Sequence, residues 1–433
     1  MADHERSSTA PVAWSLLPET ASTGANGELT IGGVAVRALA QQFGTPLFIY
    51  DEAHLRTRCR EAVAAFGPDV AYASKAFLCT AMAKLAHEEG MRIDVSTAGE
   101  LHVALAAGVP GSRLVLHGNN KSIEELTVAL DAGVGRIIID SNDEIARIEA
   151  LATSRGETIP VWIRITPGVH AHTHAFISTG QEDSKFGFSV NSGAAEAAVL
   201  RLRASSHLEL VGIHAHLGSQ VFDLDNFAEA AKVVGRFFAP LGLFELCLGG
   251  GLGEAYVNGE ATQSLAKWAD ATRTALREVG VSDEVSLSAE PGRSIVARAG
   301  VTAYTVGTIK DLPGLRTYVS VDGGMSDNPR PVLYGSGYET LLARVPQANR
   351  PRTIRLVGKH CESGDVLVSE GFVPEDLALG DVLVTPVTGA YGYAMASNYN
   401  KVPRPAVVFV ANGEARLVVR REQLSDLLSL DVG

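Results

Sequence analysis

Several polar or glycine residues stand where short apolar runs of the sequence end. They are Lys75, His117, Arg164, His216, the glycines at 249–251, and Glu290. A lysine amine can bond covalently to a carbonyl group, an imidazole can stack on a planar ring, and a buried carboxylate can keep a ring nitrogen protonated. One such residue at a strand end usually only satisfies a loop. Polar residues or glycines at the ends of six different runs instead favour one functional site.

The runs that precede these residues predict a barrel. They are VAYASKA, RIDVST, RLVLHG, RIIIDS, VWIRIT, LVGIHAHLG, LFELCLGG and EVSLSAEPG, and amphipathic helix-like segments separate them. The first four start 21 to 23 residues apart, which is the length of a βα unit. Eight such units indicate a closed (β/α)8 TIM-like barrel, whose carboxyl strand ends carry the site. An open doubly wound sheet is the alternative.

The pattern changes near residue 300, where strand-like runs follow one another without helices and Asn412-Gly413 indicates a hairpin. We therefore predict an α/β protein with a barrel over residues 46–302 and a β-sandwich or β-barrel domain over 303–433. Residues 1–45 are expected to be partly disordered. Their strand-like stretch ELTIGGVAV is expected to pair with the C-terminal β-domain, so that an N-terminal strand joins it.

Composition narrows the class of protein. The 433 residues are 46% hydrophobic and 20% charged, with a formal net charge of -12, which argues against a nucleic-acid partner. The sequence has no apolar run long enough for a signal peptide or membrane span, so we expect a cytoplasmic protein without membrane attachment.

The cysteine and histidine spacings do not indicate a metal site, and no metal is predicted. The four cysteines lie far apart, and Cys59, Cys79 and Cys247 are interpreted as small buried hydrophobic residues with free thiols. HAHTH at 170–174 is interpreted as a polar loop, because no other ligand type stands nearby at suitable spacing.

The residues at the strand ends together describe a site for pyridoxal 5'-phosphate. The glycines at 249–251 let backbone N–H groups approach a phosphate, and Ser219 offers a hydroxyl. Glu290 can protonate a pyridine nitrogen, and Arg293 can bind a carboxylate through two nitrogens. Lys75 can form a Schiff base with the aldehyde. These groups together are typical of an enzyme that uses the cofactor as an electron sink.

Eight motifs carry a resemblance to a known family from about residue 27 to the end. They are YASKA, HGNNK, HAHLGSQ, GGGLG, EPGR, VDGGMSDNPRP, CESGD and GAYGYAMASNYN. In order and spacing the sequence resembles the meso-diaminopimelate decarboxylases, which are group IV decarboxylases with an alanine-racemase-like barrel. The resemblance implies decarboxylation of meso-2,6-diaminopimelate to L-lysine and CO2 through an external aldimine, as the last step of lysine biosynthesis. It also implies a homodimer with shared active sites.

The resemblance assigns roles to matching positions. Lys75 would carry the cofactor, and Cys361, on a loop from the other subunit, would donate the final proton, with Lys75 as the alternative donor. Cofactor-binding residues would be Lys75, His216, Ser219, Gly250, Gly251, Glu290, Pro291, Gly292, Arg293 and Tyr391. Substrate-binding residues would be Arg293, Arg330, Tyr334, Glu362 and Tyr391. The acids beside Cys361 would raise the pKa of its thiol and keep it protonated.

Three rival functions differ in what they require. A decarboxylase acting on ornithine, arginine or lysine has little use for an arginine that binds a distal carboxylate, so Arg293 and Arg330 argue against it. A catalytically inactive regulatory relative is expected to lack Lys75 or Cys361, and both are present. A racemase needs two opposed bases and has no need of the CESGD loop.

Overall fold

The chain forms two compact units in the computed structural model, which describes residues 10–168 and 183–433. The barrel unit comprises Arg58–Gly253 and Thr262–Ser294, and the β unit comprises Met1–Thr57, Glu254–Ala261 and Ile295–Gly433. The HAHTH stretch at 170–174 lies outside the described residues, so its interpretation as a polar loop stays a prediction.

Eight parallel strands build the barrel unit, and each overlaps one of the eight predicted runs. They are β5 (Ala71–Ala73), β6 (Arg92–Val95), β7 (Leu114–Leu116), β8 (Arg136–Ile139), β9 (Ile159–Thr166), β11 (Leu208–Ala215), β12 (Glu245–Cys247) and β13 (Ser286–Ser288). The short β10 (Phe188–Ser189) pairs only with β9. Backbone bonds from Ala71 N to Ala289 O (2.9 Å) and from Ala73 N to Pro291 O (3.2 Å) join the last strand end to the first. The predicted barrel is therefore confirmed.

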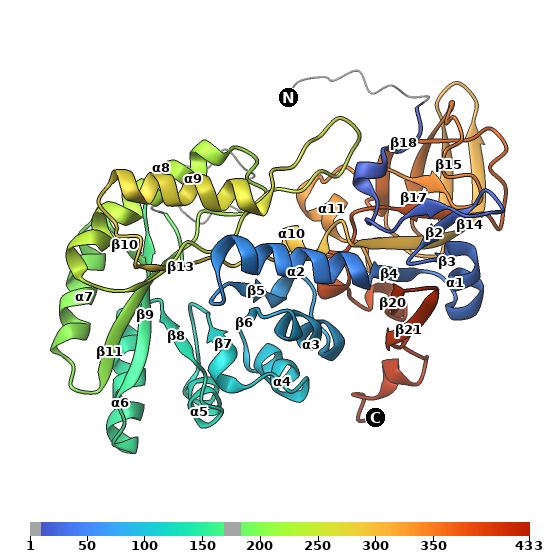
Figure 1. The fold of residues 1–433 in the computed structure, drawn as a ribbon. Coiled ribbons are helices and arrows are strands. Elements are labelled where there is room, and N and C mark those ends of the chain that lie inside the picture. Colours follow the sequence, from blue (N-terminus) through green and yellow to red (C-terminus); the bar gives the residue numbers. More distant parts are fainter. Residues whose placement is uncertain (1–9, 169–182) are drawn as a thin grey trace. The chain divides into compact units, whose positions relative to one another are not determined.

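Helices surround these strands (Figure 1). They are α3 (Thr80–Glu88), α4 (Ala98–Ala106), α5 (Ile123–Asp131), α6 (Asn142–Arg155), α7 (Ala194–Ala204), α8 (Leu224–Phe238) and α9 (Leu265–Glu278). Several start at a side chain that accepts a free backbone N–H, including Ser122, whose partner Glu125 completes a capping box before α5. Val115, Ile138, Trp162 and Cys247 form a buried cluster, so the barrel encloses packed side chains and not a channel.

The β unit is organised around one N-terminal strand. β4 (Leu47–Asp51) has every residue buried; it pairs antiparallel with β14 (Gly300–Leu312) and parallel with β20 (Ala406–Ala411). The remaining strands of this sheet are β15 (Arg316–Val321), β16 (Leu341–Leu342), β17 (Arg352–Val357), β18 (Val366–Val373), β19 (Val382–Thr385) and β21 (Glu414–Val419). An N-terminal strand therefore does join the C-terminal β-domain, as predicted.

The joining strand is not the one that the sequence suggested. ELTIGGVAV supplies β2 (Leu29–Ile31) and β3 (Val34–Ala35), which pair with each other and with β1 (Ser22–Thr23) in a small separate sheet. TPLFIYD supplies β4 instead, whose five residues are all buried and whose backbone pairs with a strand on each side.

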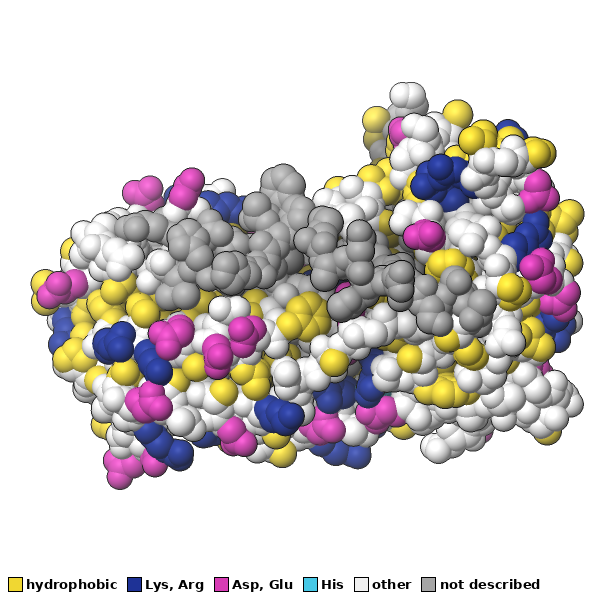
Figure 2. All heavy atoms as spheres, turned by 90° about the horizontal axis from the view of Figure 1, so that it is seen from above, with side chains coloured by type: hydrophobic (Ala, Val, Ile, Leu, Met, Phe, Trp, Pro, Cys, Tyr) yellow, Lys and Arg dark blue, Asp and Glu magenta, His cyan; other side chains and the backbone are white. Residues whose placement is uncertain are grey.

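Other expectations from composition can be compared with the described residues. Cys59 and Cys247 are buried and Cys79 is partly exposed, and none of the four cysteines forms a disulfide. No helix in residues 10–168 and 183–433 is long and apolar enough to cross a membrane. On the described part of the face in Figure 2, acidic side chains lie among lysines and arginines and do not gather into one block.

A buried carboxyl in the β unit should make stability depend on pH. Asp327 accepts hydrogen bonds from Tyr304 Oη and Gly324 N, both at 2.7 Å, and burial, helped by Asp365 and Asp322, raises its pKa from 3.8 to about 7. Between these values the folded chain keeps a proton that the unfolded chain has lost, so stability falls as pH rises.

We expect the free energy of unfolding of wild type to fall by about 2 kcal/mol between pH 5 and pH 8 because of this carboxyl. Asp327→Asn mimics the protonated form, so its stability relative to wild type should increase over the same range. Urea unfolding of both proteins at pH 5, 6, 7 and 8 measures this difference. Parallel pH profiles for the two proteins would contradict the expectation.

Candidate active site

The predicted site residues fall into two groups. The barrel unit holds Lys75, His216, Ser219, Gly250, Gly251, Glu290, Pro291, Gly292 and Arg293. The β unit holds Arg330, Tyr334, Cys361, Glu362 and Tyr391. Each group is built by the strands and loops of its own unit.

Glu290 is the central side chain of the barrel group. It follows β13, is 6% exposed, and uses both carboxylate oxygens. Oε1 lies 2.9 Å from Nε2 of His117, which follows β7, and Oε2 lies 3.0 Å from Nε2 of His214 on β11. Both histidines are buried. Two imidazoles therefore fix the plane of this carboxylate in the interior of the unit.

This arrangement determines which groups carry charge. Burial alone raises the pKa of Glu290, but His117 and His214 outweigh burial and hold that pKa well below its usual range. Burial lowers the pKa of His214 to about 4, whereas Asp94 and Glu290 overcome burial and raise the pKa of His117. The result is an ionised carboxylate between the neutral imidazole of His214 and the imidazole of His117, whose protonated form the carboxylates favour.

The same three residues are of types that bind transition metals, and their facing atoms lie within 4.8 Å of one another. Their shortest nitrogen-to-oxygen distances, 2.9 and 3.0 Å, are those of hydrogen bonds. Those bonds already explain why the three side chains come together, so the cluster does not call for an ion.

Lys75 stands directly after β5, in a 3-10 turn, Ser74–Ala76, whose other two residues are buried. The lysine itself is exposed in the single chain, which differs from the expected partly buried position. Burial raises the pKa of Asp94 and of Glu100, and the charge of Lys75 opposes both rises. The same charge adds to burial in lowering the pKa of His216. These effects place the amine near the acids and the imidazole of the same strand ends.

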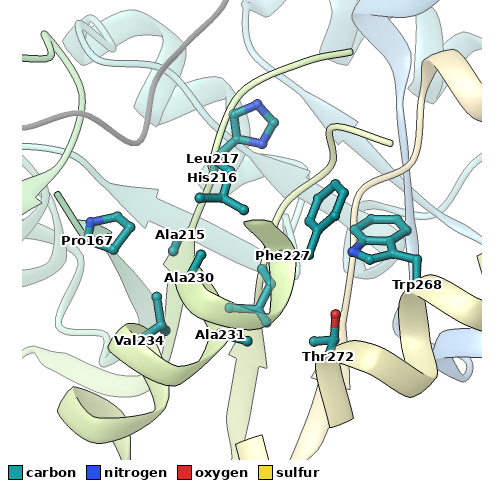
Figure 3. Close-up of a pocket in the computed structure, with 11 residues that line it drawn as sticks. Pro167, Ala215, His216, Leu217, Phe227, Ala230, Ala231, Val234, Trp268 and Thr272 are labelled. Atoms are coloured by element: carbon teal, nitrogen blue, oxygen red, sulfur yellow. The ribbon is translucent and has the colours of Figure 1, made fainter. Parts of the chain in front are cut away.

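His216 faces away from Glu290. Its Nδ1 accepts the N–H of Gly250 at 3.1 Å, and its ring lies at an apolar pocket lined by Phe227, Trp268 and neighbouring residues of α8 and α9 (Figure 3). Burial, with the charge of Lys75, holds the pKa of His216 well below its usual range. A neutral, fixed imidazole is suited to stacking on an aromatic ring.

The glycine loop comes close to backbone on both sides. A Cβ on Gly250 would collide with the carbonyl oxygen of Glu290, and one on Gly251 would lie 2.6 Å from the carbonyl oxygen of Gly218. Gly251 also has a φ of 127°. Beside the loop, Arg293 Nη2 donates to Ser219 Oγ at 2.9 Å. The loop therefore needs glycine, and a hydroxyl and a guanidinium adjoin it.

We expect Gly251→Ala to weaken binding of pyridoxal phosphate at least about ten-fold, because the methyl group displaces the backbone that forms the loop. Titration of cofactor-free protein by fluorescence measures the affinity. Gly133→Ala is a matched control, since Gly133 also has a positive φ but no atom near its missing Cβ. Equal affinities for the two variants would contradict the expectation.

A buried ion pair supports the loop that carries His117. Lys121 Nζ lies 2.5 Å from Glu144 Oε1 and donates to the carbonyl oxygens of Gly118 (2.6 Å) and Ile138 (2.7 Å). Both charged side chains are 1% exposed. Because Lys121 has three acceptors, the HGNNK loop is held from inside the unit.

Arg330 is the buried cation of the β-unit group and begins α11 (Arg330–Tyr334). Its Nη1 donates to Tyr338 Oη at 2.6 Å, and its guanidinium carbon lies 4.2 Å from the ring centre of Tyr256. Burial opposes the charge, but Tyr256 and Tyr338, with Tyr391 adding to them, raise the pKa of Arg330 above its ordinary value. An arginine held in this way suits a carboxylate ligand.

The remaining members of this group are less buried. Tyr334, the last residue of α11, and Tyr391, which has a φ of 59°, are each partly exposed. Cys361 and Glu362 are exposed. Asp365, three residues after Glu362, is buried and accepts the N–H groups of Met325 (2.7 Å) and His360 (2.9 Å). Asp365 thus has a structural role, whereas Glu362 lies at the exposed tip of the loop.

The barrel-unit residues fit pyridoxal phosphate. A glycine loop, a hydroxyl and a guanidinium suit the phosphate, the ionised Glu290 suits a protonated pyridine nitrogen, and the neutral His216 suits the ring face. Lys75 supplies the amine that the aldehyde requires.

Sequence reasoning missed several supporting residues. His214, Tyr256 and Tyr338 were given no role in the sequence analysis. The alternation of HAH indicates that His214 and His216 point in opposite directions, which could have identified His214 as the inward partner of Glu290. Tyr256 follows the glycine loop without any motif, so nothing in the sequence indicates its contact with Arg330.

Comparison with known proteins agrees with this chemistry. Residues 52–297 match the family model of the pyridoxal-dependent decarboxylases, pyridoxal binding domain. Diaminopimelate decarboxylase of Mycobacterium tuberculosis is 49% identical, covering 98% of both chains, and that of Bacillus subtilis is 47% identical, covering 94% of this chain and 96% of the relative. The crystal structure of diaminopimelate decarboxylase from M. jannaschii in complex with L-lysine has a TM-score of 0.89 at 32% identity, covering 96% of this chain and 98% of that one.

Proposed function

The chain belongs to the pyridoxal-dependent decarboxylases, and from this membership we propose that it decarboxylates meso-2,6-diaminopimelate to L-lysine and CO2, the last step of lysine biosynthesis. The observation that carries the substrate assignment is 49% identity to a diaminopimelate decarboxylase over 98% of both chains. The ionised, doubly hydrogen-bonded Glu290 supports the cofactor chemistry independently.

Bound pyridoxal phosphate supplies an electron sink for the electron pair that the departing carboxyl group leaves behind. In the proposal, Lys75 would hold the cofactor through its side-chain amine. Glu290, fixed by His117 and His214, keeps the pyridine nitrogen protonated, and His216 fixes the ring face. The glycines at 250 and 251, Ser219 and the turn Pro291-Gly292-Arg293 hold the phosphate end.

The substrate differs from a simple diamine precursor because it keeps a second carboxylate and a second ammonium group. We assign Arg293, Arg330 and Tyr334 to the retained carboxylate and Glu362 to the distal ammonium. Tyr391 contacts both cofactor and substrate in this proposal. A site with buried arginines disfavours substrates that lack the second carboxylate, since the arginines would then have no carboxylate to bind.

Cys361 donates the final proton to the carbon that has lost CO2. The S–H bond breaks, a C–H bond forms, and the thiolate regains a proton from solvent. Lys75 is the alternative donor.

We further propose a homodimer in which Cys361 and Glu362 of one subunit complete the site of the other. Their exposure in the single chain is compatible with such a contact. The cytoplasmic location and the predicted domain boundaries likewise remain predictions.

Substrate choice is tested by CO2 release from meso-diaminopimelate, L-lysine, L-ornithine and L-arginine with the cofactor-loaded protein. Release from diaminopimelate alone is the expected result. Release mainly from a substrate with one carboxylate would overturn the substrate assignment and leave the cofactor chemistry in place.

The shared site is tested by mixing two inactive variants, Lys75→Ala and Cys361→Ala. If each site draws one residue from each subunit, half of the dimers after exchange are mixed and hold one intact site of two. About a quarter of wild-type activity should then appear. Mixtures that stay inactive while light scattering shows mixed dimers would rule out the sharing.

A further inference from the structure

One segment of the β unit contacts the donor loop, which is CESGD at residues 361–365, and has no assigned role. It is the end of GAYGYAMASNYN, the 3-10 turn Tyr399–Lys401. We propose that Asn400, with Tyr399 beside it, is a positioning residue that holds Cys361 and Glu362 in the arrangement needed for proton donation. This inference rests on the proposed function.

The buried end of the donor loop is anchored without this turn. His360 is buried, and its Nε2 lies 2.8 Å from Ser326 Oγ, while its backbone N–H donates to Asp365. These bonds fix the loop on either side of residues 361–364, which are exposed. The exposed tip carries the thiol and the carboxylate that the reaction uses, so its position requires further support.

Asn400 supplies that support. Its Oδ1 accepts the backbone N–H of Cys361 at 3.0 Å. Tyr399 adds contacts with the residues on both sides: its hydroxyl lies 3.5 Å from Glu362 Oε2, and its ring centre lies 5.5 Å from that of His360. Adjacent residues of the turn therefore hold adjacent residues of the donor loop.

The turn itself is fixed and strained in a way that suits asparagine. Asn400 and Lys401 have φ values of 52° and 54°, a left-handed conformation that asparagine tolerates better than most residues. Asn398 Nδ2 donates to Val402 O at 3.1 Å across the turn and to Glu422 at 2.5 Å. Because these bonds do not involve the Asn400 side chain, the turn is expected to persist when that side chain is removed.

This geometry allows the hydrogen bond to be separated from the backbone conformation. Asn400→Gly removes the acceptor and makes the left-handed backbone easier to adopt. Asn400→Asp keeps an acceptor oxygen at the same place. Asn412→Gly is the matched control, because Asn412 also has a positive φ, 53°, but lies in the hairpin between β20 and β21.

The first measurement uses cofactor-free protein, so that it does not depend on catalysis. The rate of Cys361 alkylation by iodoacetamide is followed by peptide mass spectrometry. Loss of one hydrogen bond should release the loop tip. Alkylation of Cys361 in Asn400→Gly should therefore be about five-fold faster than in wild type. Asn400→Asp should not be faster than wild type, and Asn412→Gly should match wild type.

The second measurement uses loaded enzyme in D2O. A fixed donor delivers deuterium to one face of the carbon, so wild type and Asn400→Asp should give lysine with one configuration at the new C–D bond. Asn400→Gly should give a mixture and a kcat about five-fold lower. A purely structural role would lower stability without mixing the configurations.

The outcomes separate the two proposals. If wild type decarboxylates diaminopimelate but Asn400→Gly equals wild type in alkylation and configuration, the positioning role is wrong. If wild type releases no CO2 from diaminopimelate, the proposed function is wrong, and alkylation alone then decides whether Asn400 holds the loop.

Discussion

Replacing Lys75 by alanine should lower CO2 release at least about 1,000-fold, because the variant loses the amine that bonds to the cofactor aldehyde. Two measurements are needed. The first is CO2 release from meso-diaminopimelate, and the second is borohydride reduction followed by peptide mapping, which should locate the cofactor on Lys75 in wild type alone.

Lys84→Ala provides the control for Lys75→Ala. Lys84 lies on α3 with its side chain 66% exposed, and its contact with Glu88 is a long surface ion pair of 3.9 Å. Its replacement should leave both activity and cofactor attachment unchanged. Cofactor found on a different lysine of wild type would disprove the assignment of Lys75, even if Lys75→Ala were inactive.

Glu290→Gln should lower kcat by about 100- to 1,000-fold, because a neutral amide cannot keep the pyridine nitrogen protonated. The same change leaves His117 buried without its carboxylate partner. We therefore also expect about 3 kcal/mol lower stability in cofactor-free protein. Steady-state kinetics measures the first effect and urea unfolding measures the second.

These two effects have different causes and can be separated. Glu278→Gln is the control. Glu278 lies on α9 with its side chain 56% exposed and pairs with Lys232, so its replacement should change neither kcat nor the free energy of unfolding. If Glu290→Gln were destabilised but kept wild-type kcat at a temperature where it stays folded, Glu290 would be structural. The assignment to the pyridine nitrogen would then be withdrawn.

Much of the barrel could be predicted from the sequence because its signals are local. Each strand is a short apolar run, and each run ends at a polar residue or glycine that reaches the same face of the unit. The β unit was less accessible to this reasoning. Buried β4 is flanked by strands far away in sequence, and no periodicity within TPLFIYD identifies either neighbour.

The candidate site shows the same division. Motifs identified the residues suited to a cofactor, since lysine, histidine, glycine and glutamate each have a recognisable chemistry. They did not identify the residues that hold them, because a contact such as Tyr256 with Arg330 arises only when a loop folds against a distant helix. The exposed position of Lys75 also depends on packing that no local pattern describes.

The position of β4 has a consequence for the order of events during synthesis. Leu47 pairs with Ala303 of β14 and with Ala406 of β20, so the strand that leaves the ribosome early waits for two partners, one of them made near the end of translation. The barrel strands, by contrast, pair with neighbours in sequence order. We expect the barrel to form on the nascent chain while at least one edge of β4 stays open. We therefore expect chains truncated before β20 to expose that edge and to be prone to aggregation.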